Sequence, residues 1–238
     1  MPDAICHVHE APDALTLAQD LARFVAERLQ EGVSQRGAAL LVVSGGSTPI
    51  PFFKALALTA VDWPKVSVTL ADERWLPPDH ADSNERLVRA HLLQGLASQA
   101  RFVPLKTADA LAAHGVPELE VALQALPWPA DVVVLGMGSD GHTASLFPGS
   151  AQLAEALDDG RTARCLAVSA PLLPNVPVDR VSLSKRALLD TRQVVIHITG
   201  LSKRQLLEQA MRAGLADPLP ITLAWSRANI PCQVFYSN

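Results

Sequence analysis

The chain is poor in cysteine, and the three cysteines that it has lie far apart. Cys6, Cys165 and Cys232 form no CxxC pair, which argues against a zinc ribbon or a dithiol redox motif. An odd number of widely spaced cysteines is typical of reduced thiols and not of a disulfide framework. We therefore expect all three to be buried, reduced side chains.

Long apolar stretches are also absent. The first 15 residues, MPDAICHVHEAPDAL, carry early acids and no apolar segment of signal-peptide length. Elsewhere no run approaches the roughly 20 apolar residues that a membrane span requires. Together with the reduced thiols, these absences predict a cytoplasmic protein.

The sequence has no cluster of positive charge. Its 20 Lys and Arg residues against 24 Asp and Glu give a formal net charge of −4, without a basic run. We therefore expect neither nucleic acid nor membrane as a partner, so any anionic ligand must be held by a local site. With 49% apolar residues and no break in composition, residues 1–238 are predicted to form one domain, as a monomer or a small homo-oligomer.

Several signatures of catalysis and ligand binding are missing. No Lys-Ser/Thr pair follows Gly45 and Gly46, so there is no Walker A loop. No GxSxG motif surrounds Ser47 or Ser145, which makes both poor nucleophiles. The seven histidines show no HExxH spacing, and no metal site is predicted.

What the chain does have is a regular alternation of apolar runs and helical stripes, which predicts an α/β fold: a single-domain, doubly wound, mostly parallel sheet with helices on both faces. The expected strands are 5–9, 38–44, 66–71, 101–105, 132–135, 164–170, 180–184, 193–199 and 232–236. The expected helices are 13–35, 50–58, 83–96, 107–126 with an interruption near Gly115 and Pro117, 151–157, 187–191 and 203–213.

The stretch 131–149, DVVVLGMGSDGHTASLFPG, is the strongest candidate for an active site. A buried strand runs into a loop with three glycines, at the end of the sheet where such folds place their ligands. Gly136, Gly138 and Gly141 match GxGxxG, but Pro148 stands where a nucleotide-binding helix would continue, so we reject a dinucleotide site. His142 can act as a general base near neutral pH, with Asp140 fixing its tautomer.

Three further segments carry polar residues at the ends of predicted strands. The loop SGGSTP (44–49) offers free N–H groups at a helix start, which favours phosphate. The alternative there is that Ser47 or Thr48 only caps the helix. Asp72 and Arg74 alternate and so share one side of the chain, or else form a solvated turn. Asn84 and Lys203 also have two interpretations each. Asn84 either begins a helix or contacts a ligand, and Lys203 either faces solvent or binds an anion.

Five segments together resemble the 6-phosphogluconolactonases. They are SGGSTP (44–49), DERW with SNERL (72–75 and 83–87), GMGSDGHTASLFPG (136–149), RVSLS (180–184) and GLSK (200–203). The resemblance implies hydrolysis of 6-phospho-D-glucono-1,5-lactone, in the second step of the oxidative pentose phosphate pathway, without metal or organic cofactor.

The resemblance also implies roles for particular residues. His142 would activate water and then protonate the departing ring oxygen, and Asp140 would orient it. The substrate and its phosphate would be bound by Gly45, Gly46, Ser47, Thr48, Asp72, Arg74, Asn84, Arg180 and Lys203. Within this set, Arg74 is placed either at the phosphate or at the developing oxyanion.

Two alternatives remain. Glucosamine-6-phosphate deaminases share the glycine-histidine loop, but they carry Tyr where this chain has Arg74, and an Asn-Glu-Pro run where it has 145–148, SLFP. The glutamate of their Asp, His, Glu set is therefore missing here. The other alternative is a non-catalytic sugar-phosphate sensor, against which Asp140 and His142 argue.

Overall fold

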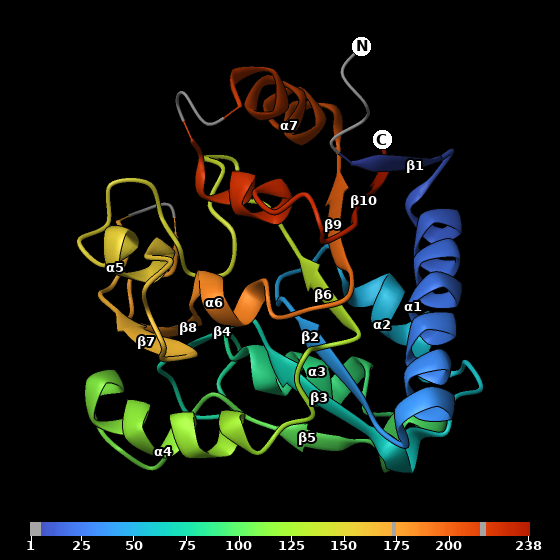
Figure 1. Ribbon diagram of the computed structural model, residues 1–238, viewed down its shortest axis with the longest axis horizontal. Coiled ribbons are helices and arrows are strands. Elements are labelled where there is room, and N and C mark those ends of the chain that lie inside the picture. Colours follow the sequence, from blue (N-terminus) through green and yellow to red (C-terminus); the bar gives the residue numbers. More distant parts are fainter. Residues whose placement is uncertain (1–5, 173–174, 215–217) are drawn as a thin grey trace.

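The computed structural model describes residues 6–172, 175–214 and 218–238. Seven parallel strands form the main sheet, in the order β1-β10-β9-β6-β2-β3-β5 (Figure 1). Their bounds are β1 His7–Ala11, β2 Ala39–Val43, β3 Val66–Leu70, β5 Arg101–Val103, β6 Val132–Leu135, β9 Val194–Thr199 and β10 Cys232–Ser237. Every residue of β2, β3 and β6 is buried, as expected for strands covered on both faces.

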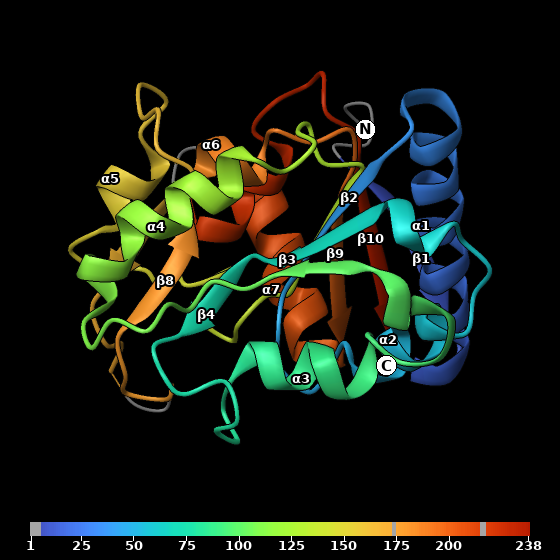
Figure 2. The same ribbon diagram turned by 90° about the horizontal axis from the view of Figure 1, so that it is seen from below.

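Helices cover both faces of this sheet. They are α1 Ala14–Arg36, α2 Ile50–Ala57, α3 Asn84–His91, α4 Ala112–Gln124, α5 Leu153–Leu157, α6 Lys185–Leu188 and α7 Leu201–Ala213, with 3-10 turns at Trp63–Lys65, Gly95–Gln99 and Pro220–Trp225. Neighbouring residues of β10 point to opposite faces. Phe235 contacts Phe24 of α1, whereas Tyr236 lies under Arg204 of α7. Figure 2 shows β9 and β10 between these two helices, and the predicted doubly wound, mostly parallel fold is confirmed.

A second, antiparallel sheet was not predicted. It contains β4 Asp72–Arg74, β8 Arg180–Leu183 and β7 Cys165–Val168, in the order β4-β8-β7. Ala71 links the sheets, because its N–H donates to Val43 of β2 and its carbonyl accepts from Leu183 of β8. The segment 72–74, for which a solvated turn was one of two interpretations, is thus a strand itself, and it lies beside the main sheet.

Several predicted boundaries were wrong. The strand predicted at 5–9 lies at His7–Ala11, and Ile5 is outside the described residues. The helix predicted to reach residue 96 ends at His91, before a turn in which Gly95 has a φ of 53°. The helix predicted at 187–191 begins at Lys185, directly after its N-cap residue Ser184. The helix predicted at 151–157 begins only at Leu153.

The helix predicted at 107–126 differs in two ways. It begins at Ala112, because Thr107 and Asp109 hydrogen-bond each other in a turn. It also continues through Gly115 and Pro117 without the predicted interruption. Gly115 has a packing reason instead, since a Cβ there would lie 2.4 Å from the ring of Trp75.

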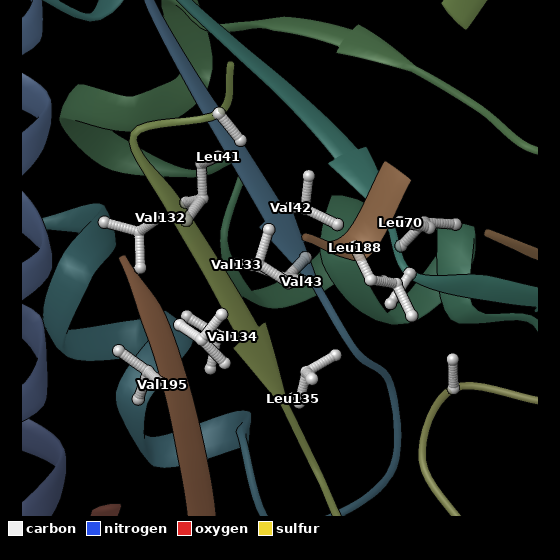
Figure 3. Packing of buried hydrophobic residues seen from close by; sticks show 14 of the residues in the cluster. Leu41, Val42, Val43, Leu70, Val132, Val133, Val134, Leu135, Leu188 and Val195 are labelled. Carbon is white, nitrogen blue, oxygen red and sulfur yellow. The ribbon is translucent and has the colours of Figure 1, made fainter. Parts of the chain in front are cut away.

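The core of the molecule lies where β2 and β6 pair. Figure 3 shows side chains of these two strands packed with residues of β3, β9 and α6. The labelled residues are Leu41, Val42, Val43, Leu70, Val132, Val133, Val134, Leu135, Leu188 and Val195. Buried side chains of both sheets belong to one hydrophobic cluster, and we therefore propose that residues 1–238 form one domain. Among the described residues, no helix is both long and apolar enough to span a bilayer.

Candidate active site

A cavity of about 260 Å³ opens at the carboxyl ends of β2, β6 and β9, beside β4 and β8. Because these strands are parallel, the loops that follow them meet at one edge of the sheet. The residues that line the cavity are Ser44, Gly45, Gly46, Ser47, Thr48, Pro49, Asp72, Arg74, Asn84, Val134, Leu135, Gly136, Met137, Gly138, His142, Thr143, Ala144, Arg180, His197 and Lys203. Every site residue predicted from the sequence is in this set except Asp140, which lies behind His142.

The loop after β6 holds His142 and Asp140 together. Nδ1 of His142 lies 2.5 Å from Oδ1 of Asp140, and the same oxygen accepts the backbone N–H of His142 at 3.1 Å. The loop is closed by the N–H of Gly138, which donates to the carbonyl of His142. A Cβ at Gly138 would lie 2.1 Å from Nδ1 of His142. Glycine is therefore required at 138 for the imidazole to occupy this position.

The charge of Asp140 fixes the proton on His142. Burial acts to raise the pKa of Asp140, but the backbone N–H, the charge and the ring of His142 outweigh burial and lower it. An ionised carboxylate only accepts hydrogen bonds, so Nδ1 of His142 must be the donor. The neutral ring then has its lone pair on Nε2. This is the arrangement that a general base requires.

Phe147 packs behind two of the cavity's side chains. Its ring centroid is 4.5 Å from that of His142 and 5.3 Å from the guanidinium carbon of Arg180. In the deaminase pattern, the Glu of the Asn-Glu-Pro run stands at this position. Here an aromatic ring supports the imidazole from one side, and no carboxylate is added to the pair.

The loop after β2 presents unpaired N–H groups to the cavity. Within the described residues, the backbone N–H groups of residues 45–48 have no hydrogen-bond acceptor. Helix α2 follows directly, and no side chain caps it. The alternative that Ser47 or Thr48 serves as the cap is therefore wrong. A Cβ at Gly45 would lie 1.9 Å from Oδ1 of Asn84, so glycine lets the loop approach α3.

Two arginines face each other across the small sheet. Arg74 of β4 and Arg180 of β8 are directly paired in the antiparallel register, and both line the cavity. Burial lowers the pKa of Arg180, and like charges opposite each other are destabilising unless a counter-ion is present. Asp72 partly supplies one, with Oδ2 3.8 Å from Arg180 and 2.5 Å from Oγ of Ser145.

Polar atoms without partners gather at this cavity. In the described part of the chain, nine buried side-chain nitrogen or oxygen atoms have no hydrogen bond, and five of the nine belong to residues that line it. They are Ser44 Oγ, Arg74 Nε, Asn84 Oδ1, Arg180 Nε and His197 Nδ1. An unsatisfied buried polar group costs about 1–3 kcal/mol. Such a cluster is typical of a site that is completed by a polar ligand.

The cavity favours an anion. Arg74, Arg180 and Lys203 line it with a single carboxylate, that of Asp72. Burial lowers the pKa of Lys203, and its ammonium group forms no ion pair with a described residue. No group of three or more His, Cys, Asp or Glu side chains in the described ranges is placed to hold a metal ion.

Among the residues that sequence reasoning did not assign to the site, four side chains matter most. Ser44 and His197 line the cavity, while Ser145 and Phe147 hold Asp72 and His142 from behind. A signal was available for His197, because it is the one polar residue in the apolar run VVIHI, whose five residues are all buried. No comparable signal marks Phe147, whose contacts depend on the fold.

Residues 12–231 match the family described as glucosamine-6-phosphate isomerases/6-phosphogluconolactonase. The chain belongs to this family. A 6-phosphogluconolactonase of Pseudomonas putida is 46% identical over 233 residues, with 93% of each chain covered. One of Rhizobium meliloti is 42% identical, with 97% of each covered. Among family members of known structure, a 6-phosphogluconolactonase from Shewanella baltica OS155 is 42% identical, with a TM-score of 0.92 and 98% of both chains covered.

Proposed function

We propose that the protein hydrolyses 6-phospho-D-glucono-1,5-lactone to 6-phospho-D-gluconate, in the oxidative pentose phosphate pathway. The observation that carries this proposal is the His142–Asp140 pair, with Nδ1 held 2.5 Å from the carboxylate at the edge of a cation-lined cavity. The names of the relatives and the arginine at 74 support a lactonase over a deaminase. Phe147, in the place of the deaminase glutamate, supports it as well.

The reaction follows from the tautomer of His142. Nε2 accepts a proton from water as the water oxygen attacks the lactone carbonyl, giving a tetrahedral intermediate and an imidazolium beside Asp140. When the bond from this carbon to the ring oxygen breaks, Nε2–H returns the proton to that oxygen as it leaves. The products are a carboxylic acid, which ionises in water, and a free hydroxyl. General acid–base catalysis of this kind contributes roughly 10²–10⁴-fold.

We assign the phosphoryl group to the loop after β2. The four free N–H groups of residues 45–48, the start of α2 and the unpaired ammonium of Lys203 together favour a dianion. Arg74 and Arg180 pair in the small sheet and line the cavity with Asp72 of the same sheet, whereas Asn84 of α3 lies against Gly45 of the loop. We place the two arginines at the lactone, where their guanidinium groups stabilise the oxyanion as it forms.

The test is lactone hydrolysis by the wild type and by His142→Ala. The lactone is generated in situ, its spontaneous loss is subtracted, and glucosamine 6-phosphate is assayed in parallel for ammonia. We expect kcat to fall by roughly 10²–10⁴-fold in the variant, while 6-phosphogluconate still binds. Ammonia release without lactone loss would indicate a deaminase, and binding without either reaction would indicate a sensor.

We further propose a cytoplasmic enzyme, since a phosphorylated lactone does not cross lipid bilayers and must be consumed where it is made. The acidic net charge of −4 supports the absence of a nucleic-acid partner. A monomer or a small homo-oligomer remains our prediction for its assembly, to be measured by light scattering. The absence of a metal or organic cofactor remains a prediction too, to be tested by activity in the presence of a chelator.

A further inference from the structure

His197 has no role in the reaction described so far, yet it belongs to the cavity. It is the fourth residue of β9, its side chain lines the cavity, and the residue is only 5% exposed. Among the described residues neither ring nitrogen has a hydrogen-bond partner, and only Nδ1 is fully enclosed, so Nε2 is the nitrogen open to the cavity. An imidazole in an apolar strand is costly to bury without a partner, so its presence calls for a ligand.

The position of His197 points to one end of that ligand. Its ring packs edge-on against Phe52, with centroids 6.1 Å apart. Phe52 lies in the first turn of α2, the helix that follows the loop of residues 45–48. On the other side, β9 leads through Gly200 into α7, where Lys203 lines the same cavity. His197 thus lies between the two elements to which we assign the phosphoryl group.

The charge of the ring suits this position. Burial lowers the pKa of His197 to about 4, and the nearby charge of Lys203 adds to the effect. The ring is therefore neutral in the range where the enzyme would work. A neutral imidazole donates one N–H to a phosphoryl oxygen without repelling the ammonium of Lys203. A second cation at this place would compete with Lys203 for the same group.

We propose that His197 is a specificity-determining residue that hydrogen-bonds the phosphoryl group of the substrate through its neutral ring. It thereby contributes to the preference for a phosphorylated over an unphosphorylated sugar lactone. This inference rests on the proposed function and extends it to a residue that distinguishes phosphorylated from unphosphorylated lactones.

The test compares 6-phosphogluconolactone with unphosphorylated glucono-1,5-lactone. His197→Phe keeps a ring of similar shape and removes both nitrogens, whereas His197→Asn keeps a donor. For His197→Phe we expect kcat/KM to fall about tenfold with the phosphorylated lactone, because one hydrogen bond to a charged group is lost. With the unphosphorylated lactone the change should be less than about twofold. His197→Asn should recover part of the loss.

A matched control is His9→Phe, since His9 also stacks on a phenylalanine, Phe235, with centroids 4.3 Å apart. His9 lies outside the cavity, so this variant should leave the ratio of the two kcat/KM values unchanged. An equal loss with both lactones in His197→Phe, or no loss with either, would overturn the proposal. Thermal unfolding of each variant shows whether it is folded. If His197→Phe does not fold, the ratio of the two kcat/KM values in His197→Asn provides the test.

Binding separates this inference from the proposed function. Calorimetric titration with 6-phosphogluconate, gluconate and inorganic phosphate needs no turnover. If the wild type hydrolyses no lactone but His197→Phe binds 6-phosphogluconate about tenfold more weakly, the function fails and the role of His197 stands. If the wild type is a lactonase and the variant binds 6-phosphogluconate with unchanged affinity, only the role of His197 fails.

Discussion

Gly138 leaves the space in which the imidazole of His142 lies. A Cβ added there would lie 2.1 Å from Nδ1 and 2.2 Å from Cε1 of that ring. Gly138→Ala must therefore rotate His142 away from Asp140, and we expect kcat to fall by roughly 10²-fold or more. Gly160→Ala is the control, since its Cβ would only touch Asp158 at 3.4 Å, far from the cavity. Equal kcat values for the two variants in steady-state kinetics would contradict this prediction.

Asp140 tests the tautomer separately from the position of the ring. In Asp140→Asn the side chain has nearly the same shape, but the amide can donate to Nδ1 and so favour the tautomer with its proton on Nε2. We expect kcat to fall by roughly 10²–10⁴-fold with KM nearly unchanged. A large rise in KM with an unchanged kcat would show that Asp140 binds substrate instead.

Half of the twenty residues that line the cavity, and most of its polar side chains, could be named from the sequence, because glycine-rich loops after apolar strands give a local signal. Arg74 and Arg180 were both candidates, but their direct pairing depends on an antiparallel sheet that no local pattern predicted. The same holds for Ser145, which hydrogen-bonds Asp72 across 73 positions of sequence. Contacts of this kind are set by the fold and not by the neighbouring residues.

A single carboxylate joins β4 to α3. Glu73 is fully buried, and it accepts the backbone N–H groups of Arg74, Asn84 and Glu85 at 2.7–2.8 Å and the hydroxyl of Ser83 at 3.1 Å. It therefore positions Arg74 and Asn84, two residues that line the cavity. From the sequence it was only one charge in a segment that could also be a solvated turn, since nothing local showed that this segment is a buried strand.

Glu73 also gives the stability a pH dependence. Burial raises its pKa from 4.5 to about 7, despite its hydrogen bonds. The folded protein then binds the proton more tightly than the unfolded chain, so this contribution to stability is present below pH 4.5 and is lost as the pH rises to about 7. Between pH 4.5 and about 7, the free energy of unfolding of the wild type, measured with urea, should fall by about 3 kcal/mol relative to that of Glu73→Gln. A constant difference between the two proteins would contradict this.

Helix α1 is fixed to the sheet by a buried acid. Asp131, at the start of β6, accepts the N–H of Leu40 at 2.8 Å and pairs with Arg36 at the end of α1. A Cβ on Gly32 would lie 2.3 Å from Oδ1 of Asp131. Because that carboxylate cannot move freely, Gly32→Ala should lower the free energy of unfolding by about 1–3 kcal/mol. Ser34→Ala, on the exposed side of α1, should change it by less than about 0.5 kcal/mol, and lactonase activity should survive in both.

The elements themselves were easier to predict than their limits. Apolar runs such as ALLVV and VVVL gave β2 and β6 almost to the residue, because both faces of these strands are buried. The start of α4 depended on the side-chain turn of Thr107 and Asp109, and that of α6 on Ser184, whose hydroxyl donates to the carbonyl of Ala163. Such contacts compete with helix formation over one or two residues and leave little trace in the apolar pattern.

Over the whole molecule, the charge of the site opposes that of the chain. The chain carries a net charge of −4, while Arg74, Arg180 and Lys203 gather at one cavity. Among the described residues, five buried polar atoms of the side chains that line this cavity also have no hydrogen-bond partner. Both features store unfavourable free energy in the native state, which a bound anion with several acceptors relieves. The protein's stability should therefore depend on its ligand.

We expect 6-phosphogluconate at 100 times its Kd to raise the free energy of unfolding by about 2.7 kcal/mol. For a chain of this size, the corresponding rise in Tm is roughly 5–10 °C. Lys203→Ala should reduce the shift at the same ligand concentration, because it weakens binding without touching His142. Gluconate, which lacks the phosphoryl group, should give a smaller shift than 6-phosphogluconate at equal concentration and ionic strength. Equal shifts with both ligands, measured by differential scanning calorimetry, would show that the cavity recognises the sugar acid and not its phosphate.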